Sequence, residues 1–385
     1  MKKGLCLLSF LAACLMMLSG ALAADDAQTT WLKESQLGPY APASQDWAAI
    51  EAAAKKEGKV VIFSVSSRIF KIQKDFKEKY GVEIEGYDIH SDEQIEKFTR
   101  EHQSGLHKTD VLFNNATSTL YGKLLPKKMI WNFVPDVFAP LLDEDEKSPF
   151  LVQRWSSRIF FYNSALHPAD PPVDNIWDLT RKEWKSKVMT PAPTGSAMAN
   201  TFQTILRRPQ DMAAAYEKEF GQPVKLSAGI KNAAEEWMLR FMKNAVVIDS
   251  TTKIFKGVAD VKQESAPMGI TTFSKLRDNK KGVYESTPAY GMEPIFGVGY
   301  PTVLVICDQA PHPNAAKLLI RYMMDEGLWP WSVLGDYAAR SDMEAKQVKE
   351  FNVPPYSELK IWNADAEYIY KTSYDYMQFA MGLGM

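Results

Sequence analysis

Short apolar runs rich in β-branched residues recur along the chain, and each is followed by a polar turn and an amphipathic stretch. The first run, residues 60–63, is typical of a strand buried on both faces. Residues 64–68 are polar, and Phe70, Phe76 and Tyr80 then recur at roughly helical spacing. This order predicts an α/β unit whose polar turn lies at the carboxyl end of the strand, where open parallel sheets bind ligands.

The same pattern continues to the end of the chain. Further strands are expected over residues 82–87, 110–113, 154–163, 188–193, 245–251, 267–273 and 295–306, and helices over residues 47–56, 92–102, 118–125, 211–220, 233–243 and 315–324 and from residue 197 onward. Strands that alternate with helices in this way favour two α/β lobes. Residues 24–44 are polar with scattered proline and predict an extended leader, whereas the aromatic-rich tail over 328–385 is expected to be helical.

Short polar side chains follow five of the expected strands. They are Ser66 and Ser67; Asn114 and Asn115; Ser156 and Ser157; Asp249, Ser250 and Thr251; and Thr271 and Thr272. A further polar turn, Thr194-Gly195-Ser196, opens a helix. Several such strand ends predict one polar cleft between the lobes. The hydroxyls of Ser66, Ser67 and Ser196 suit an anion at a helix start and suit a helix cap equally well, so both interpretations stay open.

The N-terminus predicts export. Lys2 and Lys3 precede an apolar run over residues 5–18 and an Ala-x-Ala cleavage site that ends at Ala23. A cleavable signal peptide is therefore expected over residues 1–23, with a periplasmic mature protein. The apolar run continues past Cys14, which favours ordinary cleavage over lipoprotein anchoring at this cysteine.

Composition and missing motifs exclude several classes of function. The 385 residues are 46% hydrophobic, which is ample for two domains, and the net charge of −2 gives no reason to expect nucleic acid or an anionic membrane as a partner. The sequence has no Gly-x-Ser-x-Gly, His-Glu-x-x-His or phosphate-loop motif, and its five histidines are scattered. Cys307 ends an apolar run and is expected to be a buried hydrophobe. We therefore expect a protein that is not an enzyme and that has no cofactor and no bound metal.

Five short motifs carry a resemblance to a known family. In chain order they are VIFSVSSR at residues 61–68, RIFFYN at 158–163, WDL at 177–179 with WKSKV at 184–188, APHPNAAK at 310–317 and GDYAAR at 335–340. Together they resemble the two-lobed periplasmic solute-binding proteins of ABC importers, the type that includes ferric-ion-, thiamine-, polyamine-, sugar-phosphate- and aminoethylphosphonate-binding members. The last motif departs from the family pattern because Ala338 replaces a proline.

The resemblance implies an α/β fold of the type II periplasmic-binding-protein class. Each lobe would be a mixed, mainly parallel sheet flanked by helices, and a two-strand hinge near residues 154–160 and 296–303 would join the lobes. Lobe 1 is expected to comprise residues 45–157 and 299–335, and lobe 2 residues 158–298 and 336–385. The implied function is capture of a small solute by a monomer and delivery to the membrane permease of an ABC importer, or presentation to a sensor kinase.

Departures from the family bear on the solute. Ferric-binding members carry His or Tyr just after the Ser-Ser-Arg segment, where Ile69 and Phe70 stand here, and adjacent tyrosines later in the chain, where residues 271–274 are Thr-Thr-Phe-Ser. A small organic anion (a phosphorylated metabolite, a phosphonate or a carboxylate) is therefore the expected solute, with ferric ion as the alternative. Arg68, Arg154 and Arg158 are candidate anion clamps.

The expected ligand-binding set follows from the strand ends and the resemblance. It comprises Ser66, Ser67, Arg68, Asn114, Asn115, Trp155, Arg158, Thr194, Gly195, Ser196, Asp249, Ser250, Thr251, Thr271, Thr272, Phe273 and Tyr290.

Overall fold

A computed structural model describes residues 27–383, apart from the side chains of Ser196 and Ala197. The signal peptide expected over residues 1–23, with Cys14, lies outside the described residues. Within residues 27–383, no helix is both long enough and apolar enough to cross a membrane.

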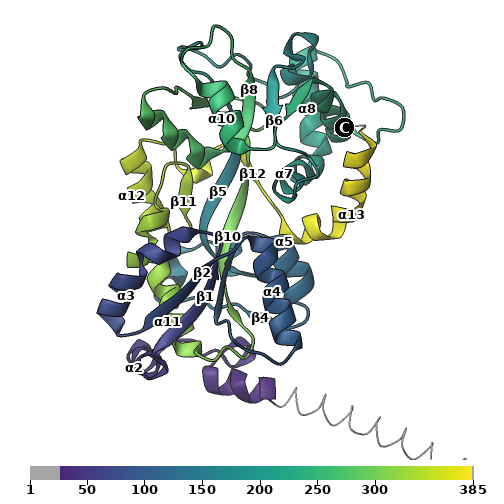
Figure 1. Ribbon diagram of the computed structural model, residues 1–385. Coiled ribbons are helices and arrows are strands. Elements are labelled where there is room, and N and C mark those ends of the chain that lie inside the picture. Colours follow the sequence, from purple (N-terminus) through teal and green to yellow (C-terminus); the bar gives the residue numbers. More distant parts are fainter. Residues whose placement is uncertain (1–26, 384–385) are drawn as a thin grey trace, which may run out of the picture.

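Two long antiparallel strands, β5 (Leu151–Tyr162) and β10 (Gly297–Cys307), run through the middle of the molecule and connect its two halves (Figure 1). Their pairing extends from Gly297 opposite Ile159 to Leu304 opposite Leu151, with a register shift between Thr302 and Val303. Both strands are mostly buried, as their long apolar runs predict. They stand where the two-strand hinge is expected.

The lower half in Figure 1 is built on the N-terminal strands β1 (Lys59–Ser64), β2 (Glu83–Asp88) and β3 (Val111–Asn114). β1 pairs in parallel with β2 and β3, and β3 pairs antiparallel with β10. The helices of this half are α2 (Trp47–Glu57), α3 (Gln73–Tyr80), α4 (Ser91–Gln103), α5 (Thr117–Thr119), α6 (Glu144–Lys147) and α11 (Pro313–Met323), and β4 (Ile130–Trp131) pairs with β10. The π-helical turn η3 (Leu120–Leu124) continues α5.

The upper half contains β6 (Val188–Thr190), β7 (Ala245–Val247), β8 (Met268–Thr272) and β9 (Thr287–Pro288). β6 pairs in parallel with β7 and β8, and β8 pairs antiparallel with β5. The helices of this half are α7 (Ser196–Leu206), α8 (Pro209–Phe220), α9 (Ala233–Asn244) and α10 (Thr251–Ala259). The α/β class with a mixed, mainly parallel sheet flanked by helices is thereby confirmed in both halves.

The C-terminal segment returns along the hinge. β11 (Asp336–Ala338) pairs with β5 and β12 (Ile361–Asn363) pairs with β10, and these strands alternate with α12 (Ser341–Phe351) and α13 (Ala366–Gly382). The prediction of a helical tail was therefore wrong at the two short strands, which extend the sheet at the hinge. In Figure 1, α13 starts beside α5 and rises to α7 in the upper half.

Short turns of helix complete the chain. They are η1 (Gly38–Tyr40), η2 (Ser67–Lys71), η4 (Ala139–Leu141), η5 (Asp178–Thr180), η6 (Lys182–Trp184), η7 (Phe273–Lys281), η8 (Glu326–Trp331) and η9 (Tyr356–Glu358).

The expected extended leader is partly helical, which corrects the prediction for residues 24–44. Residues 27–35 form a helix, and Leu32 and Leu37 are buried. The indole N–H of Trp31 donates to the Ala310 carbonyl at 3.0 Å, and the Lys317 ammonium donates to the Ser35 carbonyl. Burial against α11 and the segment before it therefore overrides the polar, proline-containing composition that predicted an extended chain.

Candidate functional site

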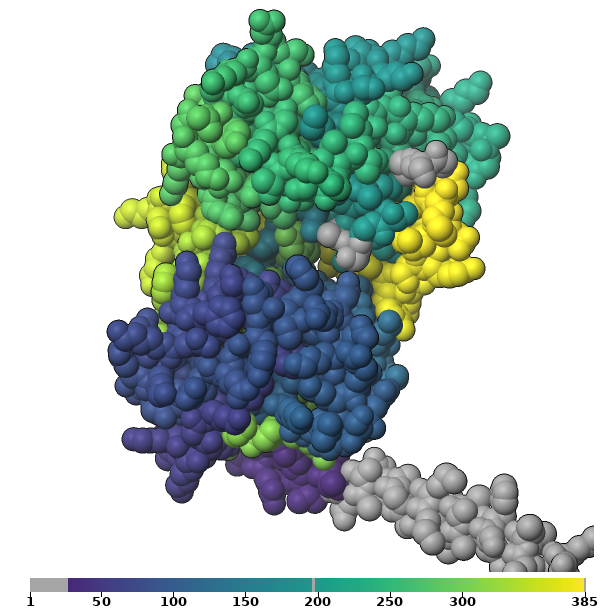
Figure 2. All heavy atoms as spheres, viewed as in Figure 1, coloured from purple at the N-terminus to yellow at the C-terminus, as the bar shows by residue number. Residues whose placement is uncertain are grey.

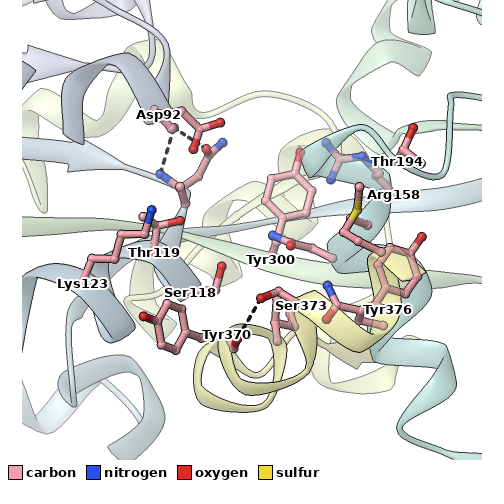
Figure 3. Close-up of a pocket in the computed structure, with 18 residues that line it drawn as sticks. Asp92, Ser118, Thr119, Lys123, Arg158, Thr194, Tyr300, Tyr370, Ser373 and Tyr376 are labelled. Atoms are coloured by element: carbon pink, nitrogen blue, oxygen red, sulfur yellow. Dashed lines mark hydrogen bonds between the residues drawn. The ribbon is translucent and has the colours of Figure 1, made fainter. Parts of the chain in front are cut away.

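A cavity of about 460 Å³ opens between the two halves, on one face of the hinge strands. Figure 2 shows the surface hollowed between the halves, and Figure 3 shows the side chains around the cavity. Four parts of the fold supply the lining: the lower half gives Ser91, Asp92, Asn115, Ser118, Thr119 and Lys123; the hinge gives Arg158 and Tyr300; the upper half gives Thr194, Asn200 and Gln203; and α13 gives Ile369, Tyr370, Ser373, Tyr376 and Met377.

Three of the expected ligand-binding residues line this cavity, one from each part of the expected cleft. Asn115 stands in the lower half, where its side-chain carbonyl accepts a 2.6 Å hydrogen bond from the Ser91 hydroxyl. Arg158 lies on β5 with its guanidinium carbon 4.6 Å from the centre of the Tyr300 ring. Thr194 stands in the turn that leads into α7 and is exposed.

Arginines gather on the same face of β5 around a single carboxylate. Because side chains alternate along a strand, Arg154, Ser156 and Arg158 share one face. Asp336 receives a 2.7 Å hydrogen bond from the Ser156 hydroxyl, and its other oxygen lies 3.9 Å from Arg154 Nε and 3.7 Å from Arg68 Nη1. Two guanidiniums therefore share one carboxylate, and Arg158 adds a third positive charge nearby.

The pKa values of Arg154 and Arg68 are both lowered, chiefly by burial. Burial lowers the pKa of the Arg154 guanidinium, and Arg68 lowers it further while Asp336 opposes both effects. Burial likewise lowers the pKa of Arg68, and Arg277 of η7 in the upper half adds to the decrease. Arg154 Nε is buried without a hydrogen-bond partner among the residues that the structure describes. Such a group of guanidiniums suits an anionic occupant.

Tyr300 places a phenol beside these arginines. Burial raises its pKa, and the neighbouring charges of Arg158 and Arg154 oppose the rise. The hydroxyl is therefore protonated at neutral pH and can donate a hydrogen bond to a solute oxygen.

At the strand ends of the lower half, Asn114 and Ser66 make hydrogen bonds within the protein. Asn114 is buried: its amide donates to the Ser91 carbonyl and to Gln94, and its oxygen accepts from the Ala116 N–H, so it shapes the loop that presents Asn115. The Ser66 hydroxyl accepts from the Arg68 backbone N–H at 3.3 Å, which is the cap that the sequence left open.

Trp155, an aromatic residue expected to contact the solute, lies on the other face of β5 from Arg158. Trp155 points away from the arginines because it alternates with Arg154 along β5. Its indole N–H donates to Glu146 at 2.9 Å, and its ring stacks on Tyr356 behind the hinge. Ser157 shares that face, and its hydroxyl is buried.

The strand ends of the upper half also stay outside the cavity. Asp249 is exposed and pairs with Lys253, and Ser250 caps α10. The other expected residues also lie outside the lining of the cavity. Ser67 is exposed and Thr271 is buried. Gly195 is the N-cap of α7, Thr251 is the first residue of α10, Thr272 is the last residue of β8, and Tyr290 packs on Phe273 and Phe296. Phe273 is buried against Gly335, and a Cβ added at Gly335 would lie 2.5 Å from the Phe273 ring. The side chain of Ser196 lies outside what the structure describes.

The sequence interpretation missed the contribution of α13. Five of its residues face the cavity, at spacings of one, three and four along the helix. This spacing places them on one face, and an amphipathic pattern in the aromatic tail was the available signal.

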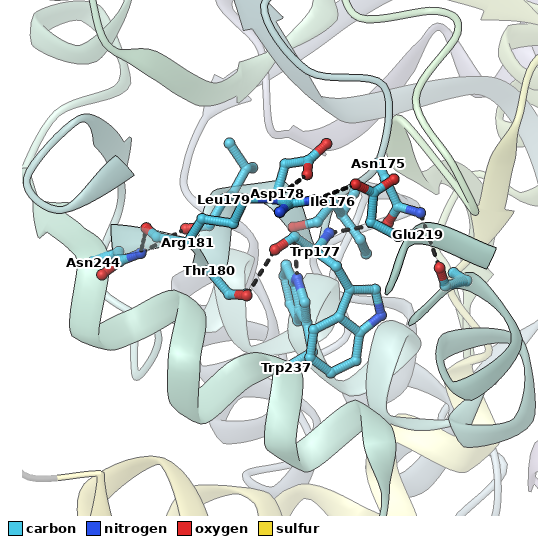
Figure 4. A network of polar contacts seen from close by, with 11 residues as sticks. Asn175, Ile176, Trp177, Asp178, Leu179, Thr180, Arg181, Glu219, Trp237 and Asn244 are labelled. Atoms are coloured by element: carbon cyan, nitrogen blue, oxygen red, sulfur yellow. Dashed lines mark hydrogen bonds and ion pairs between the residues drawn. The ribbon is translucent and has the colours of Figure 1, made fainter. Parts of the chain in front are cut away.

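A separate acidic group lies in the upper half, away from this cavity. Carboxylate oxygens of Asp174, Asp178 and Glu219 lie within 4.8 Å of one another. Arg181 already compensates them, since it donates to Asp178 at 2.6 Å and pairs with Glu219 (Figure 4). Burial and the charge of Asp178 raise the pKa of Glu219. The group is therefore an ion-pair network that supports η5.

Comparisons with known proteins agree with this architecture. Residues 71–350 match the family model described as bacterial extracellular solute-binding protein. Similar solved structures include iron-bound HitA from Pseudomonas aeruginosa (TM-score 0.64, 16% identity, covering 85% of this chain and 99% of that one). A second is Trichodesmium FutA in complex with iron and citrate ligands (TM-score 0.59, 14% identity, covering 85% of this chain and 99% of that one). A third is an ABC transporter protein from Clostridium perfringens (TM-score 0.62, 13% identity, covering 84% of this chain and 99% of that one). No curated protein sequence matches the chain significantly. At these identities the structural likeness shows the fold alone, and it confirms the two-lobed binding-protein fold.

Proposed function

Because the chain belongs to the family of bacterial extracellular solute-binding proteins, we propose that it captures a small organic anion in the cavity between its halves. The anion is a phosphorylated metabolite, a phosphonate or a carboxylate, and the recipient is the membrane permease of an ABC importer. Members of this family bind solutes and are not enzymes. We also propose that residues 45–157 and 299–335 form lobe 1 and that residues 158–298 and 336–385 form lobe 2.

The observation that carries the proposal is a group of three arginines at the hinge: Arg158 lines the cavity, Arg154 lies on the same face of β5, and Arg68 comes from η2. Arg68, Arg154 and Arg158 outnumber their one carboxylate, Asp336. An anion would restore the charge balance, and bidentate hydrogen bonds from guanidinium favour the planar or tetrahedral oxygens of carboxylate, phosphate and phosphonate.

The mechanism is closure of the two halves on the solute. Asn115 comes from the lower half, Arg158 from the hinge and Thr194 from the upper half, so a solute finds all its partners only when both halves contact it. The bound state is therefore the closed state, and the solute shifts the population toward it.

Ferric ion is the second candidate, because similar structures contain iron and because the cavity holds oxygen donors of its own. Tyr300, Tyr376 and Asp92 offer phenol and carboxylate oxygens. Burial raises the pKa of both phenols, so binding of a ferric ion would include release of their protons. The Tyr376 hydroxyl is moreover engaged with the Pro193 carbonyl at 2.7 Å.

A thermal-shift screen tests the proposal. The purified protein is heated with citrate, glycerol 3-phosphate, glucose 6-phosphate or 2-aminoethylphosphonate, and separately with ferric chloride. An anion at about 100 times its Kd should stabilise the protein by about 2.7 kcal/mol. A shift with ferric ion and with none of the anions would replace the proposal by the iron alternative.

The arginine that faces the cavity gives a sharper version of the test. We expect Arg158→Gln to weaken binding of the active anion by roughly 10- to 100-fold, because a charge-assisted hydrogen bond contributes about 1.5–3 kcal/mol. Calorimetric titration measures the Kd. The matched control is Arg100→Gln, since Arg100 is an exposed residue on α4 that pairs only with Glu96. Equal losses in the two variants would show that the effect is one of overall charge.

A further inference from the structure

The C-terminal helix α13 supplies one complete wall of the cavity. Ile369, Tyr370, Ser373, Tyr376 and Met377 face the cavity from a single face of the helix. The opposite face carries exposed residues such as Gln378. The family match ends at residue 350, so this wall comes from a part of the chain beyond the matched region.

Side-chain contacts fix α13 to the upper half. The Tyr376 hydroxyl donates to the Pro193 carbonyl at 2.7 Å, and the Thr372 hydroxyl donates to Gln203 on α7 at 2.9 Å. Asp365, which caps the helix, pairs with Arg207 at 2.8 Å. These contacts hold α13 against α7 and the turn before it.

The first turns of α13 reach the lower half as well. The Tyr370 ring packs on Gly122 so closely that a Cβ at Gly122 would lie 2.3 Å from the ring. The helix thus spans the side of the opening between the halves (Figure 1). A solute in the cavity has α13 on one side and the arginine-bearing hinge on another.

We propose that α13 determines which solutes the cavity accepts, with the small side chain of Ser373, at the centre of its cavity face, leaving room for solutes larger than inorganic phosphate. This inference rests on the proposed function, because it assigns the selectivity of the same cavity. Ser373 has a small side chain whose hydroxyl donates to the Tyr370 carbonyl at 2.9 Å, so it takes up little of the space in front of the helix. A bulky side chain at residue 373 would fill that space.

Two phosphates of different size test this selectivity. Calorimetric titrations with inorganic phosphate and with glucose 6-phosphate are carried out on the wild type, Ser373→Trp and Gln378→Trp. Glucose 6-phosphate binding should weaken by about tenfold or more in Ser373→Trp, because the added ring fills space that the sugar needs, while phosphate binding stays close to the wild-type value. Gln378→Trp should leave both unchanged. An unchanged Kd for glucose 6-phosphate in Ser373→Trp overturns the proposal.

A reaction without solute separates this proposal from the proposed function. Ser373→Cys and Gln378→Cys each add one thiol to a chain whose Cys307 is buried. Iodoacetamide should modify both new thiols, whereas a maleimide carried on a large polymer should modify Cys at residue 373 several-fold more slowly than at residue 378. If the polymer-bound maleimide modifies the two positions at equal rates, α13 does not form a wall of the cavity and the proposal is overturned. A wild type that binds neither phosphate, nor any anion of the thermal-shift screen, but shows the slow reaction overturns the proposed solute class and supports the wall.

Discussion

Glu146 has an unusual environment for a carboxylic acid, at the back of the hinge. One oxygen accepts from the Trp155 indole N–H and the other from the Asp143 backbone N–H, both at 2.9 Å. Burial dominates over these hydrogen bonds and raises the pKa to about 7. The folded protein therefore keeps the proton at pH values where the unfolded chain, with an ordinary glutamate, has released it.

The raised pKa predicts how stability depends on pH. Because the folded state binds the proton more tightly, the free energy of unfolding falls as pH rises from about 4.5 to 7, by up to about 3 kcal/mol. Glu146→Gln keeps the acceptor for Trp155 and removes the titration. We expect the free energy of unfolding of the variant, relative to that of the wild type, to be higher at pH 8 than at pH 5. Urea unfolding at the two pH values measures this difference.

The control for this prediction is Glu144→Gln, in the same short helix but exposed. Its difference from the wild type should be the same at both pH values. A parallel pH dependence for the wild type and Glu146→Gln would mean that Glu146 is ionised in the folded protein.

At the scale of elements, the pairing of β5 and β10 depends on the absence of a side chain at Gly297. A Cβ there would lie 2.6 Å from the Arg158 carbonyl oxygen and 2.8 Å from the Ile159 side chain. The obstacle includes backbone, which cannot turn aside as a flexible side chain could. We expect Gly297→Ala to destabilise the protein by about 1–3 kcal/mol in urea unfolding, since the strands must separate where they cross between the halves.

Gly291→Ala is the matched control, because a Cβ at that position meets nothing within 4 Å. Its effect should stay within about 0.5 kcal/mol. If both substitutions cost the same, the loss comes from the general difference between glycine and alanine and not from the strand contact.

The apolar patterns were sufficient to predict most of these elements. The buried run at residues 60–63 is β1, and the long runs that contain Phe161 and Val305 are the two hinge strands. The patterns could not show which polar strand ends stay in the interior. Asn114 and Asn115 are neighbours of the same type, yet only Asn115 lines the cavity, because the fold uses Asn114 for hydrogen bonds to backbone. Pairings between distant segments, such as Tyr370 on Gly122, leave no local signal.

At the scale of the whole molecule, the two halves should approach each other when an anion binds. Arg158 on the hinge and Thr194 in the upper half line the same cavity as Asn115 in the lower half. On the proposed function, small-angle scattering should show a smaller radius of gyration once the active anion saturates the wild type. At an anion concentration of about three times the wild-type Kd, where a variant that binds at least tenfold more weakly is mostly unoccupied, Arg158→Gln should keep the larger radius. Compaction in both proteins would place the closing contacts elsewhere.

The arginines on both sides of the gap have a consequence for how solutes are distinguished. Arg277 in the upper half is near enough to Arg68 in the lower half to lower its pKa, in addition to the larger effect of burial, while Asp336 opposes the decrease. The like charges of the two arginines therefore oppose each other across the gap. On the proposed function, a monoanion would remove part of this repulsion and a dianion would remove more, which would make ionic valence a criterion of recognition alongside shape. A phosphate ester loses its second proton near pH 6. On the proposed function, acidification would therefore weaken its capture through the solute's own chemistry, without the titration of any group on the protein.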